Sequence, residues 1–101
     1  ATLAHELVHW TGHKSRCDRQ FGKRFGDDAY AFEELVAEIG SAFVCAHMGI
    51  PLEGLQHTNY LASWLKVLKA DKRAIFTASS QAKRSSEFLL TDTSVIEKIA
   101  A

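Results

Sequence analysis

The sequence predicts a mainly α-helical fold, because helix boundaries are clearly marked and patterns typical of strands are nearly absent. Its 101 residues are enough to bury a core. Hydrophobic residues make up 47% of the chain and charged residues 24%, which is ordinary for a globular protein. We therefore expect residues 1–101 to form one helical domain or a piece of one.

Turn-forming and capping residues divide the chain into helices. Gly12 ends the first helix, and Asp27 or Asp28 can cap the start of a long second helix that stops before Gly49 and Pro51. Asp71 can cap the last long helix. The expected helices cover residues 2–13, 28–48, about 58–70 and about 72–89.

The most informative motif is His5-Glu6-Leu7-Val8-His9 on the first predicted helix. Residues four apart lie on the same face of a helix, so both histidines can bind one metal ion. Glu6 lies beside His5, where it can face a water molecule at that metal. This H-E-x-x-H pattern is typical of zinc metallopeptidases, although two histidines on an ordinary amphipathic helix are an alternative interpretation.

The second predicted helix carries two acidic residues at the same spacing. Glu34 and Glu38 share one face with small residues, which would let another helix approach closely. Carboxylates on a partly buried face are costly unless a cation or hydrogen bonds compensate them. A solvated acidic side of a long helix is the alternative. The apolar stripe of this helix is expected on another face, formed by Phe32, Val36, Ile39 and Phe43.

A catalytic zinc ion needs a third protein ligand beyond His5 and His9 and leaves one position for water. The candidates in the sequence are His13, Ser15, Glu33, Glu34 and Glu38. The longer H-E-x-x-H-x-x-G-x-x-H signature requires histidine at position 15, where this chain has serine, so that signature is excluded. His13 comes too early for its turn and is expected at an exposed helix end.

Glu34 is the expected third ligand, from the second helix. Glu38, one turn later, can accept the second ring N–H of a ligand histidine. An exchange of roles between Glu34 and Glu38 remains open. Glu33 points to a different side, and we expect it to cap the helix or to pair with a basic residue of segment 14–24.

The chemistry expected from these residues is hydrolysis. Zn²⁺ would lower the pKa of a bound water molecule towards neutrality, and Glu6 would accept its proton and pass it to the leaving amine. A further donor must stabilise the oxyanion in the transition state. His57 and Tyr60 are the candidates, with Tyr30 as another, although each also has an ordinary structural explanation.

Charge and cysteine content exclude several other classes of protein. Twelve basic residues balance twelve acidic ones, so no overall field attracts the chain to nucleic acid or to a membrane. No apolar run approaches the length of a membrane span. Cys17 and Cys45 form no C-x-x-C pair, and we expect two free thiols in a reducing cytoplasm.

Three separated motifs resemble one known family. They are HELVHWTGH at 5–13, FGDDAYAFEELVAEIG at 25–40, and WLKVLK at 64–69 followed by DKR at 71–73. In order and spacing they are similar to the metallopeptidase domain of ArdC-type antirestriction proteins, which also occurs in TraC-type primases and phage polyvalent proteins. The resemblance spans roughly residues 1–90.

The resemblance implies zinc at His5, His9 and an acidic residue of the second helix, with Glu6 catalytic. It also implies that the chain is the helical C-terminal portion of a zincin-like domain whose upstream strands are missing. Members of this family typically carry an N-terminal domain that binds single-stranded DNA, and they belong to bacterial mobile elements. We therefore expect a bacterial, cytoplasmic parent protein.

These observations lead to one functional hypothesis and two alternatives. The hypothesis is a gluzincin-like zinc metallopeptidase domain that hydrolyses a peptide or protein substrate. One alternative is a non-catalytic antirestriction module that binds DNA or protein and retains a zinc site. The other is a purely structural zinc site, which would have four protein ligands and no open position. Nickel, cobalt or manganese could also occupy histidine and carboxylate ligands.

Overall fold

The computed structural model describes residues 2–19, 28–50, 65, 68–92 and 97. Its defined helices are α1 (Thr2–Thr11), α2 (Asp28–Met48) and α4 (Ala74–Thr91), and residues 68–70 are also helical. No strand is present within these ranges. The prediction of a mainly α-helical fold is therefore confirmed for the described part of the chain.

Helices α1 and α2 each end directly before a glycine that the sequence marks as a turn residue. Helix α1 ends at Thr11, two residues before the expected end, and the amide of Gly12 donates to the carbonyl of His9 over 2.9 Å. Helix α2 ends before Gly49, which has a φ of 71°. This left-handed conformation is easily adopted by glycine, and it brings the amide of Ile50 to 2.9 Å from the carbonyl oxygen of Cys45.

Helix α4 begins at Ala74, two residues after the expected start. The carboxylate of Asp71 accepts the backbone N–H of Arg73 over 2.9 Å, so Asp71 stabilises the turn before the helix rather than its first helical turn. The predicted helix at 58–70 lies mostly outside the described residues, and only its end at 68–70 is seen as helical.

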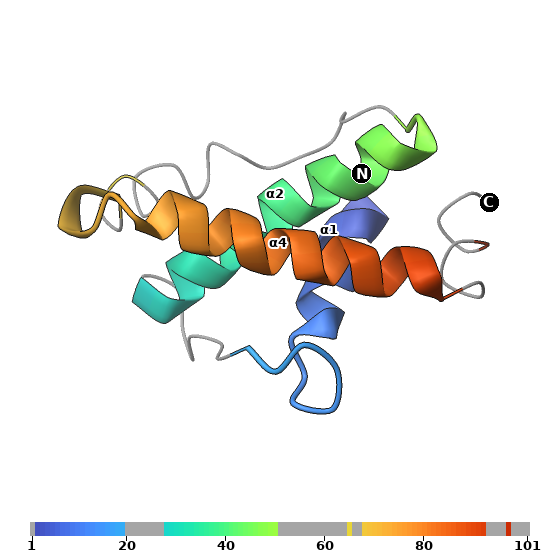
Figure 1. Ribbon diagram of the computed structural model, residues 1–101, viewed down its shortest axis with the longest axis horizontal. Helices are drawn as coiled ribbons and strands as arrows, with labels where there is room; N and C mark the ends of the chain where they lie inside the picture. Colours follow the sequence, from blue (N-terminus) through green and yellow to red (C-terminus); the bar gives the residue numbers. More distant parts are fainter. Residues whose placement is uncertain (1, 20–27, 51–64, 66–67, 93–96, 98–101) are drawn as a thin grey trace.

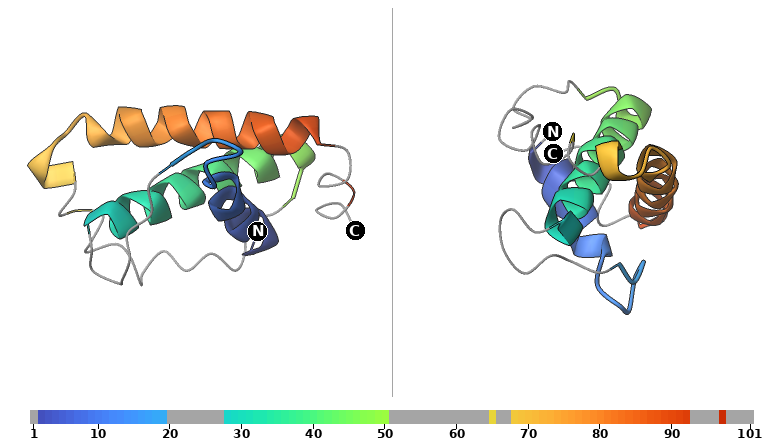
Figure 2. Two further views of the ribbon diagram at one scale, coloured as in Figure 1. Left: turned by 90° about the horizontal axis from the view of Figure 1, so that it is seen from below. Right: turned by 90° about the vertical axis from the view of Figure 1, so that its left-hand side faces the viewer.

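The three helices pack against one another in pairs. Helices α2 and α4 run in the same general direction with their axes crossing, and α1 lies across both (Figures 1 and 2). Apolar side chains from all three helices fill the space between them. The fully buried members of this core are Val8, Val36, Ala37, Val44, Cys45, Ala78, Ala82 and Leu89.

A glycine allows α1 to approach α2 closely. A Cβ atom at Gly40 would lie 3.0 Å from both Cγ atoms of Val8, whose side chain is completely buried. Such a separation is shorter than normal van der Waals contact between carbon atoms, and a β-branched side chain has little freedom to move away. Gly40 therefore lets the H-E-x-x-H helix lie directly on α2.

The predicted apolar stripe of α2 is only partly correct. Val36 is fully buried, and Phe32 and Ile39 are partly buried against the core, but Phe43 is 41% exposed. The reason is that α2 contacts both α1 and α4, so its buried surface is broader than one stripe and includes the face that carries Glu34.

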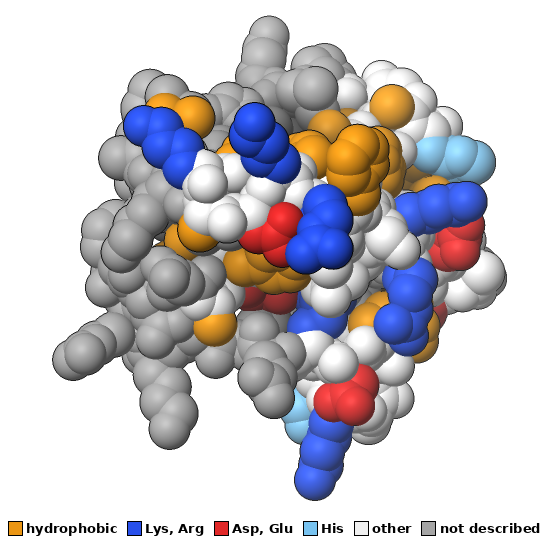
Figure 3. All heavy atoms as spheres, turned by 60° about the vertical axis from the view of Figure 1, so that its left-hand side comes forward, with side chains coloured by type: hydrophobic (Ala, Val, Ile, Leu, Met, Phe, Trp, Pro, Cys, Tyr) orange, Lys and Arg blue, Asp and Glu red, His pale blue; other side chains and the backbone are white. Residues whose placement is uncertain are grey.

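The face of the molecule in Figure 3 carries charge of both signs. On the face shown in Figure 3, the described Lys and Arg side chains lie among acidic, apolar and uncharged groups. This agrees with the equal numbers of basic and acidic residues in the sequence. Among the described residues, no helix combines the length and apolarity needed to cross a membrane.

Candidate metal centre

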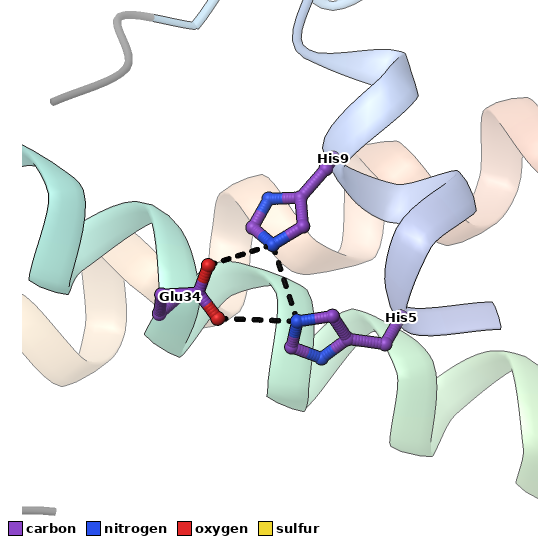
Figure 4. A group of neighbouring side chains, drawn as sticks. All are labelled: His5, His9 and Glu34. Atoms are coloured by element: carbon purple, nitrogen blue, oxygen red, sulfur yellow. Dashed lines mark hydrogen bonds and ion pairs between the residues drawn. The ribbon is translucent and has the colours of Figure 1, made fainter. Parts of the chain in front are cut away.

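Helices α1 and α2 bring two imidazole rings and one carboxylate together. His5 and His9 project from α1 towards α2, and the carboxylate of Glu34 faces both rings, with one oxygen towards each (Figure 4). The two Nε2 atoms are 3.1 Å apart. Oε2 of Glu34 is 3.1 Å from Nε2 of His5, and Oε1 is 2.9 Å from Nε2 of His9.

These distances are close to those of a metal coordination shell. Bonds of about 2.0–2.2 Å arranged tetrahedrally place neighbouring ligand atoms about 3.3–3.6 Å apart. The observed separations of 2.9–3.1 Å are shorter by only a few tenths of an ångström. Ligand atoms from His5, His9 and Glu34 all lie within 4.8 Å of one another. This donor set fits a single divalent cation.

A carboxylate also lies beside the other ring nitrogen of each histidine. Oε1 of Glu38 is 2.7 Å from Nδ1 of His5, and Oε2 of Glu33 is 2.9 Å from Nδ1 of His9. A proton held on Nδ1 leaves the lone pair on Nε2, which is the nitrogen that faces Glu34. With a proton on each Nδ1, both Nε2 atoms would be electron-pair donors towards the same point when a metal ion is bound.

Glu33 contacts both Arg19 and His9, and the sequence predicted only the first kind of contact. A salt bridge to a base of segment 14–24 was one expected role, and Arg19 does contact Glu33 at 2.8 Å. The contact of Glu33 with His9 was not predicted. Adjacent positions of a helix differ by about 100° in direction, so Glu33 and Glu34 can lie on either side of one imidazole ring. The contact of Glu33 with His9 could therefore have been suspected from the position of Glu33 directly before Glu34.

The carboxylates of this cluster are buried, so their stability depends on the positive charges and hydrogen-bond donors around them. The exposed fractions of Glu33, Glu34 and Glu38 are only 4%, 4% and 5%. Carboxylates removed from water are costly unless cations or hydrogen-bond donors surround them. The imidazole rings and the Arg19 guanidinium compensate the charge here, and a divalent cation would add to that compensation.

The same contacts shift the pKa values of the metal-free cluster. Burial alone would lower the pKa of His5, but its contacts with Glu34 and Glu38 outweigh burial and raise it to about 9. Burial is likewise outweighed at His9 by Glu33 and Glu34, and its pKa also rises to about 9. Burial would raise the pKa of Glu34, but the two imidazoles lower it to about 2.

The metal-free protein should therefore lose stability as the pH rises from 6.5 to about 9. A histidine whose pKa is raised by folding contributes stability that is complete below its unfolded pKa of 6.5 and is lost through the folded pKa near 9. Glu34 contributes in the opposite direction: its stabilisation is present above its unfolded pKa of 4.5 and is lost as the pH falls towards 2. The contribution of these three groups to the free energy of unfolding is greatest between pH 4.5 and pH 6.5.

Urea unfolding in the presence of a chelator, repeated across this pH range, measures the effect. The Glu34→Gln variant is the control, since loss of its charge should flatten the dependence between pH 6.5 and 9. Stability of the parental chain that stays constant or increases over that interval would contradict the proposed charge balance.

The other predicted site residues differ in their placement. Glu6 is exposed on α1, about 100° round the helix from His5 and about 60° from His9. His13 is exposed, as expected, and its ring contacts Ser15 at 2.8 Å. Tyr30 lies half-buried on α2. His57 and Tyr60 lie outside the described residues.

Comparison with known families agrees with this geometry. The model of the zincin-like metallopeptidase family MPTase-PolyVal matches residues 1–81. The uncharacterised protein y4eC of Sinorhizobium fredii is 44% identical over 90 residues, which are 88% of this chain and 29% of that protein. A DNA primase TraC of Escherichia coli is 46% identical over 90 residues, covering 89% of this chain and 8% of the primase.

A solved structure has the same fold. The manganese(II)-bound crystal structure of antirestriction protein ArdC from plasmid R388 matches with a TM-score of 0.79 and 49% sequence identity. The match covers 89% of this chain and 34% of the ArdC chain. The resemblance to ArdC-type proteins seen in the motifs is confirmed. The chain thus spans about a third or less of the length of these relatives.

Proposed function

We propose that this chain, which belongs to the zincin-like metallopeptidase family, is a gluzincin-like domain that hydrolyses peptide bonds with zinc as its cofactor. The observation that supports it most is the convergence of the Nε2 atoms of His5 and His9 on the carboxylate of Glu34. In the proposal these three residues are the metal ligands, and Glu38 positions His5 through Nδ1.

Zinc is proposed because two imidazoles and a carboxylate are a common ligand set of catalytic zinc. The ArdC structure is manganese(II)-bound, which supports a divalent cation, and nitrogen and oxygen ligands also accept manganese. When bound, the metal ion supplies Lewis acidity, which makes water a nucleophile near neutral pH and polarises a carbonyl group.

Glu6 is the proposed general base and acid. Its exposed position beside the two histidines allows its carboxylate to reach a water molecule and a substrate that enter from solvent. Glu6 would accept a proton from the attacking water and then deliver it to the amine that leaves the cleaved peptide bond. A carboxylate that accepts and returns one proton balances the hydrolysis without any other titrating group.

Stabilisation of the oxyanion is assigned to His57 or Tyr60, as the sequence suggests. An imidazolium or phenol donor aimed at the developing negative charge would lower the barrier, because such donors interact more strongly with the transition state than with the substrate carbonyl. These two roles rest on the sequence alone.

The parent protein is proposed to be an antirestriction or conjugation-associated protein of a bacterial mobile element. The names of the relatives, an antirestriction protein and a DNA primase, support this setting. Its partners would be a peptide or protein substrate for this domain and single-stranded DNA for another domain of the parent. A cytoplasmic location would bring such a protein to both partners.

Metal removal tests the proposal directly. Full-length parent protein is incubated with a mixture of fluorogenic peptides before and after treatment with a chelator, and then with added Zn²⁺ or Mn²⁺. We expect chelation to abolish hydrolysis and Zn²⁺ to restore it. Hydrolysis that survives complete removal of metal would contradict the mechanism. Tight zinc binding with no cleavage of any peptide would favour the non-catalytic binding module instead.

A further inference from the structure

The guanidinium of Arg19 connects all three helices at one buried position. Its side chain is only 4% exposed, although Arg19 lies in the segment that follows α1. The Nη1 group donates to the hydroxyls of Thr11, over 2.9 Å, and Ser85, over 2.6 Å. The Nη2 group donates to the carbonyl of Val8 over 2.6 Å. Thr11 and Val8 belong to α1, and Ser85 belongs to α4.

The same guanidinium holds both oxygens of Glu33 on α2. Nε of Arg19 donates to Oε1 over 2.8 Å, and Nη2 donates to Oε2 over 3.0 Å. Such a bidentate contact fixes the plane of a carboxylate as well as its position, which the single ammonium group of lysine does not do. Glu33 therefore has little freedom to rotate.

One oxygen of Glu33 transmits this constraint to the candidate metal centre. Oε2 accepts from Arg19 on one side and lies 2.9 Å from Nδ1 of His9 on the other. The opposite ring nitrogen of His9 faces Glu34. The orientation of the His9 ring, and hence the direction of its Nε2 lone pair, depends on where Oε2 of Glu33 is held.

We propose that Arg19 is a positioning residue of the metal centre, which acts through Glu33 on the metal ligand His9. Thr11 and Ser85 orient the guanidinium, so α4 contributes to metal affinity although none of its described residues lies within the ligand group. This inference rests on the proposed metal site and adds a residue that the H-E-x-x-H motif does not contain.

Metal affinity of the full chain, measured by competition with a chromophoric chelator, tests the proposal. We expect Arg19→Lys to weaken zinc binding by about 10-fold, the lower end of the cost of losing the direct partner of a ligand, because Glu33 remains beside His9, and Arg19→Met to weaken it at least as much. The visible absorption spectrum of the Co²⁺-loaded protein should also change in Arg19→Lys, because it reports the ligand geometry, which a purely structural role would leave unchanged.

The matched control is Arg84→Lys, which changes an exposed arginine next to Ser85 on α4. It should keep the parental affinity and the parental cobalt spectrum. A second variant, Ser85→Ala, removes one acceptor of the guanidinium and should lower affinity in the same direction but less. Its small volume change makes it informative even where Arg19→Lys does not fold without metal.

Parental affinity and an unchanged cobalt spectrum in a folded Arg19→Lys protein would overturn the proposal. Where that variant does not fold, parental affinity in folded Ser85→Ala would overturn it. These outcomes are distinct from failure of the proposed function: a parental chain that binds zinc but hydrolyses nothing contradicts only the peptidase activity. A parental chain that binds neither zinc nor cobalt contradicts the metal site and this inference together.

Discussion

Glu6→Gln should abolish peptide hydrolysis while zinc binding stays at the parental level. The glutamine amide has nearly the same size as the carboxylate but cannot accept a proton from water, so the loss should be about 10²–10⁴-fold in kcat, the usual contribution of a positioned acid or base. Zinc binding should persist because Glu6 is exposed and lies outside the group formed by His5, His9 and Glu34.

The measurement is the initial rate of cleavage of a fluorogenic peptide by zinc-loaded full-length parent and variant, with zinc content determined on the same samples. Glu87→Gln is the matched control, since Glu87 is an exposed glutamate on α4 whose contact with Lys83, at 3.9 Å, is weak. Its rate should equal that of the parent. A Glu6→Gln protein that cleaves at the parental rate would disprove the assigned role.

Glu34→Gln should cause the largest loss of metal affinity among the acidic residues of α2. Its carboxylate faces both Nε2 atoms, with one oxygen towards each, and the amide that replaces it has no negative charge and is a poor ligand. Glu38 lies beside Nδ1 of His5, the ring nitrogen on the side away from Glu34, so Glu38→Gln should act through the orientation of that ring. We expect a loss of more than about 100-fold for Glu34→Gln and about 10–100-fold for Glu38→Gln.

Competition titration measures the zinc affinity of both variants under one condition. Circular dichroism of the metal-free proteins verifies that each variant is folded. The comparison is matched, because both substitutions remove one charge from a carboxylate that is about 5% exposed. A larger loss in Glu38→Gln than in Glu34→Gln would mean that the two residues exchange roles, the alternative that spacing alone leaves open.

Several features of the site could be predicted because they depend on positions within one helix. The four-residue spacing of His5 and His9 places both rings on one face, and the same spacing does so for Glu34 and Glu38. In the structure, both histidines and Glu34 meet, and Glu38 lies beside His5. The exposure of His13 follows equally from the end of α1 at Thr11.

Contacts between separate elements were harder to predict. Nothing in the sequence indicates that Arg19, rather than another base of the same segment, reaches Glu33, or that Ser85 lies at its other side. The exposed side chain of Phe43 was wrongly expected in the apolar stripe. Such contacts depend on how helices lie across one another, which a periodic pattern along a single helix does not specify.

Sequence alone predicts the helical class, the pairs of histidines and glutamates and the chemistry that these residues favour, because helix periodicity relates neighbours within a few residues. Which carboxylate faces which ring nitrogen depends on how α1 packs on α2. The close contact of Val8 with Gly40 limits how far α1 lies from α2. A rotation of either helix by one residue, about 100°, would bring different side chains together.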